Sequence, residues 1–230
     1  MKRFVLFFVL ILLPSGLLAA SIDLPETGQT SCWDDTSQLR LDCQGEGVGQ
    51  DAAVAAGLAL PSPRYVDNSN GTVKDNLTGL VWLKHTSCFG LQTWAEALDS
   101  ANRLWGGSVL EPNLRPSCNL YDGSRAGDWR VPNVNEMASL DNAGADYFRF
   151  SLESKFGYVK AQFTDKYWTS TTDAQDPDEA WSASIISGMV LLQQAKTNTG
   201  YAWFVRDGSP DDGIVSLPAT GQTSCFEVNG

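Results

Sequence analysis

The chain has 230 residues, a formal net charge of −11 at neutral pH, five cysteines and one histidine. Its acidity argues against nucleic acid as a partner, because phosphate binding depends on a basic surface. The single histidine and the wide spacing of the cysteines leave little material for a zinc cluster or a histidine-based catalytic triad, so we expect one ordinary domain without enzymatic activity.

Residues 1–20 have the pattern of a secretory signal peptide. Lys2 and Arg3 precede an unbroken apolar run over 4–13, and small residues up to Ala20 offer a cleavage site. The apolar run is shorter than the roughly 20 residues that span a bilayer. We therefore expect an exported protein that is not membrane-embedded and that resides in the periplasm, outside the cell or on its surface. The expected mature chain has 210 residues, with 14 basic against 27 acidic side chains and a net charge of −13.

A nine-residue sequence occurs near both ends of the expected mature chain. Residues 24–32 read LPETGQTSC and residues 217–225 read LPATGQTSC, so eight of the nine positions are identical. The copies lie in an N-terminal lead-in, 21–62, and in a C-terminal tail, 209–230. One interpretation is a linker or edge strand that frames a domain. The other is association between chains, because exposed edges template pairing; the protein would then be a homo-oligomer, with Cys225 as a cross-link.

The first strands of the domain are predicted from a turn and from alternation. Two short alternating segments, 64–67 and 72–75, flank Asn70-Gly71, a dipeptide that favours the tight turn of a β-hairpin. Residues 78–84 then alternate in the manner of a third strand.

Two amphipathic helices are marked by their N-terminal caps. Thr93 with Glu96, and Asn133 with Glu136, have the spacing of a capping box, in which two side chains satisfy backbone amides of the first turn. Apolar residues follow each cap at helical spacing. The apolar positions are Trp94, Ala97, Leu98, Ala101, Leu104 and Trp105 in the first helix, and Val134, Met137, Ala138 and Leu140 in the second.

The last third of the domain predicts an antiparallel meander. Aromatic, β-branched or alternating residues occupy 167–171, 180–187, 189–196 and 201–206, with turn sequences between them. A hairpin, two helices and then several short strands indicate an α+β domain over 63–208, with the two helices packed on short antiparallel strands.

The chain resembles the Lcl C-terminal domain family, named after the terminal domain of a bacterial collagen-like adhesin. Each motif that carries the resemblance is short, but their order along 63–208 is specific. The resemblance implies a C-type-lectin-like fold and an exported binding module for cell adhesion to a glycan or surface polymer. The motifs are TVKDNLTGLVWLK at 72–84, Thr93-Trp94, GDWRVP at 127–132, Asn135-Glu136, YWTST at 167–171, Ala180-Trp181, Gly188 and Val205-Arg206.

The founding adhesin's domain is associated with sulfated glycosaminoglycans, and the acidity of this chain opposes that ligand. A polyanion would need a local basic patch to overcome a net charge of −13. The candidates are Arg149, Lys155, Lys160 and Lys166, for which scattered, solvated surface charges are the alternative.

An acidic loop between two predicted strands is the candidate ligand-binding site. Asp173, Asp176, Asp178 and Glu179 supply oxygen atoms that suit calcium, which could bridge to sugar hydroxyls. Asp176 and Asp178 are the candidate metal ligands. The alternative is an ordinary acidic turn of the kind that aspartate and proline favour.

The eight tryptophans are predicted to divide between core and surface. Flat aromatic faces suit sugar rings, and Trp33 and Trp105 are the candidates for such a role, with Trp105 included in the candidate ligand site. The other six occupy motif or alternating positions and are expected in the core. They are Trp82, Trp94, Trp129, Trp168, Trp181 and Trp203.

Four cysteines are predicted to form two local disulfides, as expected in an exported protein. Cys32 with Cys43 would enclose a short loop, and Cys88 with Cys118 would bracket the first helix and the loop after it. Cys225 is left over. Three functions remain open at this point: a lectin-like adhesion module, which we expect; a structural subunit that assembles through its terminal repeats; and an enzyme, which ranks last. Formylglycine-generating enzymes share a distantly lectin-like fold, but their reactive cysteine pair has no counterpart here, since the cysteines fit local disulfides.

Overall fold

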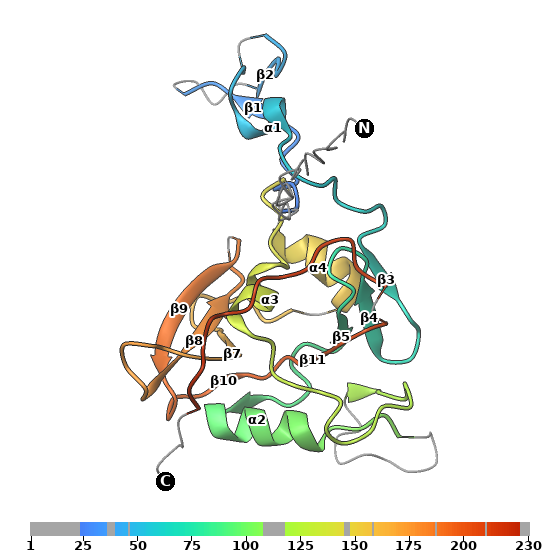
Figure 1. Cartoon of the computed structure of the whole chain (residues 1–230), viewed down its shortest axis with the longest axis vertical. Coiled ribbons are helices and arrows are strands. Elements are labelled where there is room, and N and C mark those ends of the chain that lie inside the picture. The colour runs from blue at the N-terminus through green and yellow to red at the C-terminus, as the bar shows by residue number, and fades with distance from the viewer. Residues whose placement is uncertain are drawn as a thin grey trace, which may run out of the picture.

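The computed structural model describes residues 24–35, 40–45, 47–107, 118–144, 148–157, 159–186, 188–209 and 211–225. The expected signal peptide, residues 1–20, lies outside the described residues. The described chain forms a mixed α+β body from which a small N-terminal unit projects (Figure 1). No described helix is long and apolar enough to cross a membrane.

The N-terminal unit is small and is held by covalent and backbone links. It contains β1 (Cys32–Trp33), β2 (Arg40–Leu41) and the single-turn helix α1 (Asp51–Val54). The predicted disulfide between Cys32 and Cys43 is formed within it. Pro25 pairs with Leu58 in a parallel bridge, which closes the base of the unit where it meets the body.

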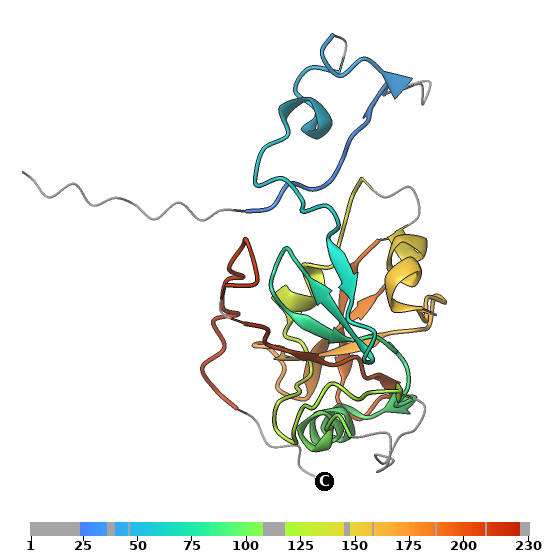
Figure 2. The same ribbon diagram turned by 90° about the vertical axis from the view of Figure 1, so that its right-hand side faces the viewer.

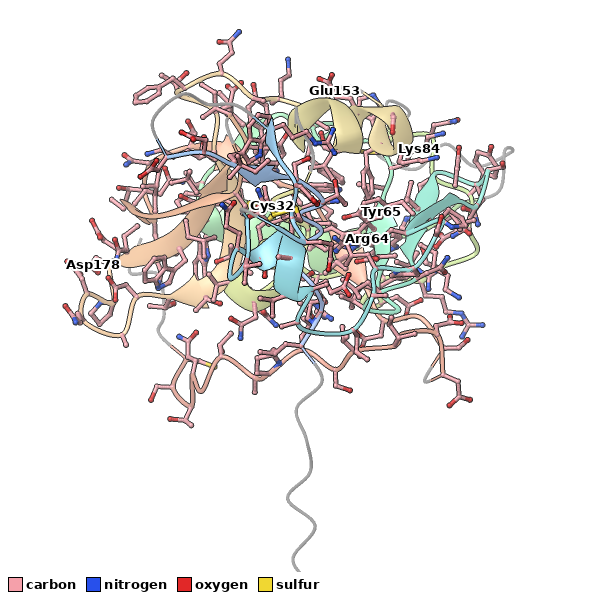
Figure 3. All side chains as sticks on the ribbon, turned by 90° about the horizontal axis from the view of Figure 1, so that it is seen from above. Cys32, Arg64, Tyr65, Lys84, Glu153 and Asp178 are labelled. Atoms are coloured by element: carbon pink, nitrogen blue, oxygen red, sulfur yellow. A yellow bond between two sulfur atoms is a disulfide. The ribbon has the colours of Figure 1, made fainter. Side chains whose placement is uncertain are left out.

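The body contains a four-stranded antiparallel sheet with the order β11-β5-β4-β3. The predicted hairpin is confirmed: β3 (Tyr65–Asp67) pairs with β4 (Thr72–Asp75), and β5 (Val81–Leu83) follows within the predicted third strand. Arg64, at the start of the hairpin, is buried and pairs with Asp75 at 3.2 Å. Figure 3 shows Arg64 beside Tyr65.

A second sheet has five strands in the order β6-β10-β7-β8-β9. The three long strands match the predicted meander and pair antiparallel. The prediction of one strand over 201–206 is wrong, because β10 (Gly200–Tyr201) and β11 (Val205–Arg206) belong to different sheets and β10 runs parallel to β7. Residues 202–204 are all buried, so the chain crosses the core there instead of alternating. The remaining strands are β6 (Leu91–Gln92), β7 (Tyr167–Thr172), β8 (Glu179–Ser184) and β9 (Val190–Ala195).

Both predicted helices form, and both capping boxes are present. The helix α2 (Trp94–Arg103) is capped by Thr93, and α3 (Val134–Ala138) is capped by Asn133. The expected number of two helices is too small, because α1 and α4 (Phe148–Phe156) also form. Leu152 and Phe156, one turn apart in α4, are both buried, but no capping box marks the start of this helix in the sequence, so it was not predicted.

Aromatic side chains fill the space between the sheets and helices. The ring centroids of Trp82 and Trp203 lie 5.0 Å apart, and Phe156 meets Trp203 edge-on at the same distance. The second predicted disulfide, between Cys88 and Cys118, is also formed. Five of the six tryptophans expected in the core are buried there; they are Trp82, Trp94, Trp129, Trp168 and Trp203. Trp181 is the exception, since it is only half-buried.

Candidate functional site

A hollow lies between the body and the C-terminal copy of the repeat. We call it the tail groove. It has a volume of about 700 Å³, within the range of small-ligand sites. In Figure 1 the C-terminal chain, coloured red, crosses α3 and passes β8, and Figure 2 shows the same chain on the outside of the body. Its residues 220–224 form one side of the groove. The groove is lined by Val134, Asn135, Thr171, Thr172, Asp173, Ala174, Gln175, Trp181, Leu191 and residues 220–224.

The β-strands supply the apolar side of the groove. Ala180 and Ser182 of β8 are buried, so Trp181 between them faces the opposite side of the strand and stays partly exposed. Leu191 of β9 lies in the same lining. The pairing of β7 with β8 is irregular between Trp168 and Thr172, which is where β7 reaches the groove.

The helix α3 is fixed at the groove by several hydrogen bonds. Its first amide, from Val134, donates to Thr171 Oγ1 at 3.0 Å. Glu136 accepts from the cap amide of Asn133 at 2.8 Å and from Arg130 Nη1 at 2.6 Å. Arg130 also pairs with the exposed Asp207. This network sets the position of Asn135, whose side chain reaches the tail.

The C-terminal copy of the repeat is attached to the body by one apolar contact and two side-chain hydrogen bonds. Leu217 is partly buried against the core. Asn135 Nδ2 donates to the carbonyl oxygen of Pro218 at 2.8 Å, and the amide of Thr172 donates to Gln222 Oε1 at 3.2 Å. The segment is otherwise exposed from residue 218 to residue 225.

The chain before this copy is anchored to the four-stranded sheet. Lys74 Nζ pairs with Asp212 Oδ1 at 2.6 Å, and the amides of Ile214 and Val215 both donate to the carbonyl oxygen of Leu77. Val215 is buried. The hydrogen bond from Lys74 holds the pKa of the Asp212 carboxyl below its ordinary value.

The lining of the tail groove is polar but almost uncharged. Amide and hydroxyl groups predominate, and Asp173 is the one charged side chain among the described lining residues. Asp173 Oδ1 already accepts the backbone amide of Gln175 at 3.0 Å, so its carboxylate also shapes the turn. The groove therefore offers neutral hydrogen-bonding groups beside an aromatic face.

The structure divides the predicted acidic loop. Asp173 lines the groove, whereas Asp176, Asp178 and Glu179 do not. Asp176 Oδ1 accepts the amide of Asp178 at 3.1 Å, as in a turn closed by an aspartate side chain. Figure 3 shows Asp178 at the edge of the molecule. In the part of the chain that the structure describes, no three acidic, histidine or cysteine side chains are grouped to hold a metal, and calcium binding by Asp176 and Asp178 stays a prediction.

Lys196 binds the backbone of the acidic loop. It is buried, its Nζ donates to the carbonyl oxygen of Pro177 at 2.7 Å, and the same ammonium lies 4.2 Å from the ring centre of Trp94. Burial lowers the pKa of this ammonium, and the charge of Asp178 opposes that shift. The loop is thus tied to the buried end of α2.

The other predicted ligand residues lie outside the groove. Trp105, just beyond the end of α2, is half-buried and does not line it. Of the basic candidates, Lys155 is exposed and Lys160 and Lys166 are half-buried, and none belongs to the lining. The Arg149 side chain lies outside the described residues.

A second hollow of about 440 Å³ lies beside the turn that joins β3 and β4. It is lined by charged and aromatic side chains, among them Lys84, His85 and Tyr121. Lys84 and Asp67 form an ion pair at 2.5 Å across its rim, and this hydrogen bond lowers the pKa of Asp67. Two of its charged side chains are therefore occupied with one another.

Sequence reasoning missed Trp181, Gln175 and Asn135 as groove residues. Trp181 was assigned to the core because it alternates with apolar neighbours. A strand of a two-sided sheet carries such alternation on either face, so the pattern alone did not show which face meets solvent. The repeat was visible in the sequence, but its contact with α3 was not.

Residues 71–206 match the Lcl C-terminal domain, which covers more than half of the chain. The chain belongs to the Lcl C-terminal domain family. The expected resemblance is thereby confirmed, and the matched region runs from the residue before β4 to the end of β11. It contains the body side of the tail groove, whereas the C-terminal copy lies beyond it. A comparison with curated proteins gives no match.

Proposed function

We propose that this Lcl C-terminal domain is an exported, non-catalytic binding module that holds an uncharged glycan or extracellular polymer in the tail groove, with Trp181 as its stacking surface. The observation that carries the proposal is the partly exposed side chain of Trp181 in a groove lined by amide and hydroxyl groups. A sugar presents the matching chemistry, since its ring has an apolar face and its edges carry hydroxyl groups.

The polar groups lie where they can bind the edges of a stacked sugar. The Gln175 amide offers donors and an acceptor on the turn after β7, and hydroxyl groups of residues 220, 223 and 224 line the opposite side. Thr171 is already engaged by α3, so its role is to position the helix. Hydrogen bonds from neutral groups fix the orientation of a ligand while the aromatic face supplies most of the buried area.

Charge favours a neutral ligand over a sulfated one. The described lining contains no lysine, arginine or histidine and includes the carboxylate of Asp173. The whole chain carries −11, so the approach of a polyanion is opposed at long range and no local cation compensates in the groove. The ligand that we propose therefore differs in charge from a sulfated glycosaminoglycan.

The family and the covalent structure support an adhesive, extracellular role. Membership of the Lcl C-terminal domain family suggests an adhesin-related domain, and we propose a C-type-lectin-like fold on the same basis. The two disulfides are compatible with an oxidising compartment outside the cytosol. Calcium bound by Asp176 and Asp178 would be a separate feature of the loop outside the groove.

A glycan array probed with the full chain tests the proposal. We expect binding to neutral glycans, and a loss of about tenfold or more in affinity for Trp181→Ala, because a central aromatic anchor is removed. Trp105→Ala is the matched control, since it deletes another half-buried tryptophan that does not line the groove. Equal losses in both variants, or binding to sulfated glycans alone, would contradict the proposal. Repeating the array with a chelator tests calcium.

A further inference from the structure

The two copies of the repeat adopt the same turn in different surroundings. Gly28 has a φ of 81° and Gly221 a φ of 77°, a left-handed conformation that glycine adopts without a steric cost. In each copy the amide of the following glutamine faces the hydroxyl of the preceding threonine, at 3.3 Å in the N-terminal copy and 3.4 Å in the C-terminal copy. The TGQ sequence therefore forms this turn by itself.

The groups that attach the C-terminal copy to the body are available in the N-terminal copy. Leu24, which corresponds to the anchoring Leu217, is 62 % exposed. The side chain of Gln29, which corresponds to Gln222, makes no hydrogen bond within the described part of the chain. Both copies thus carry the same anchors, but only the C-terminal copy uses them on α3 and β7.

The carbonyl group of Pro25 is also left unused by the pairing with Leu58. In the pairing with Leu58, the carbonyl oxygen of Leu24 and the amide of Glu26 make the two hydrogen bonds, at 2.8 and 2.9 Å. Successive carbonyl groups of an extended chain point to opposite sides, so the Pro25 carbonyl faces away from Leu58. It corresponds to the Pro218 carbonyl that Asn135 binds.

Exchange of one copy for the other would leave the tail groove unchanged. Residues 220–224, which form its tail side, are TGQTS, identical to residues 27–31. The single difference between the copies, Glu26 against Ala219, lies outside the lining and at an exposed position of the C-terminal copy. A second chain could therefore supply the same wall.

We propose that the surface formed by Asn135, Thr172 and the Leu217 contact is a recognition site for the LPxTGQTS segment, and that the N-terminal copy of a second chain binds there in place of the chain's own C-terminal copy. The result is head-to-tail association between copies of this chain. This proposal does not depend on glycan binding, because it concerns the segment that forms one side of the groove and not a ligand bound inside it.

Competition from the attached copy sets the concentration at which this exchange occurs. A tethered segment has an effective concentration in the millimolar range, so a free segment of equal affinity displaces half of it at about that concentration. Association is therefore expected at high local density, such as chains crowded on a surface, and not in dilute solution.

Displacement by a peptide tests the proposal on the full chain. Cys225 is the one cysteine outside the two disulfides, so a nitroxide spin label there reports the mobility of the C-terminal copy. A peptide with the sequence of residues 24–31 should mobilise the label in a saturable way, with a midpoint near millimolar. A peptide with Gln29→Ala should need about fivefold more, because it lacks one hydrogen bond.

Variants of the chain distinguish displacement from other effects of the peptide. Gln222→Ala weakens only the attached copy and should lower the midpoint about fivefold. Asn135→Ala weakens both competitors equally and should leave the midpoint unchanged. Ala219→Ser, a change at an exposed position of the C-terminal copy outside the groove lining, should leave it unchanged as well. No mobilisation at several millimolar peptide, or equal midpoints for the two peptides, overturns the proposal. Neither result bears on the glycan array.

Discussion

The N-terminal and C-terminal copies of the repeat share eight of nine residues but are held in opposite ways. The N-terminal copy is fixed by pairing with Leu58, by the disulfide of Cys32 and by the amide of Ala143, which donates to the Thr27 carbonyl at 2.9 Å. The C-terminal copy is held by Leu217 and two side-chain hydrogen bonds, and its cysteine is free and exposed. The turn is thus set by the local sequence, whereas its attachment is set by the neighbours that the fold supplies.

The largest expected difference between the copies comes from the disulfide. Replacing both Cys32 and Cys43 by serine removes a link across 11 residues, and we expect the N-terminal unit to lose about 3 kcal/mol of stability against local unfolding. Hydrogen exchange measured by mass spectrometry should speed up over 24–58 and stay unchanged over 217–225. Faster exchange over 217–225 as well would show that the stability of one copy depends on the other, and would contradict the claim that each copy is held by its own contacts.

Substitution of the turn glycines gives a smaller and more selective difference. Alanine at Gly28 or at Gly221 meets the same backbone strain, about 1 kcal/mol, because both have a positive φ. At Gly28 an added Cβ would also lie 2.3 Å from Asn142 Oδ1, whereas at Gly221 nothing lies within 4 Å. We therefore expect Gly28→Ala to lower the thermal midpoint of unfolding by more than Gly221→Ala does. Equal shifts would contradict the contact between the N-terminal copy and the turn after α3.

The smallest expected effect is the pH dependence of the ion pair between Lys74 and Asp212, which anchors the chain just before the C-terminal copy. The hydrogen bond from Lys74 lowers the pKa of Asp212, so the folded chain favours the ionised carboxylate. The stabilising contribution is present at neutral pH and is lost as the pH falls through the lowered pKa of this carboxyl, which lies below the ordinary aspartate range. Asp212→Asn should remove this pH dependence from the mobility of a label at Cys225. Asp211→Asn, a change at the exposed neighbour, should retain it, and a flat profile in the unaltered chain would contradict the anchor.

Much of the body could be predicted because its signals are local. The capping boxes at Thr93 and Asn133 and the turn at Asn70-Gly71 are each complete within a few residues, and all three are present in the structure. The division of 201–206 between two sheets was not predictable, since it depends on the burial of Trp203 and Phe204 between elements distant in sequence. The helix α4 was missed for a local reason, because no capping box marks its start in the sequence.

The candidate site was predicted less well because it is assembled from distant segments. Asp173 was expected near a ligand and does line the groove, and the tryptophan in the lining is Trp181, whereas Trp105 lies outside it. Whether a strand residue faces solvent depends on what covers the sheet, and here the covering segment is a tail about 40 residues later in the chain. Composition and periodicity carry no information on such a contact.

A crystal structure of the full chain with the tightest-binding oligosaccharide from the array is the most direct test of the central claim. We predict a sugar ring stacked on Trp181, between the turn at 173–175 and residues 220–224 of the C-terminal copy. A sugar bound instead in the hollow at Lys84, His85 and Tyr121, with the tail groove empty, would contradict the account.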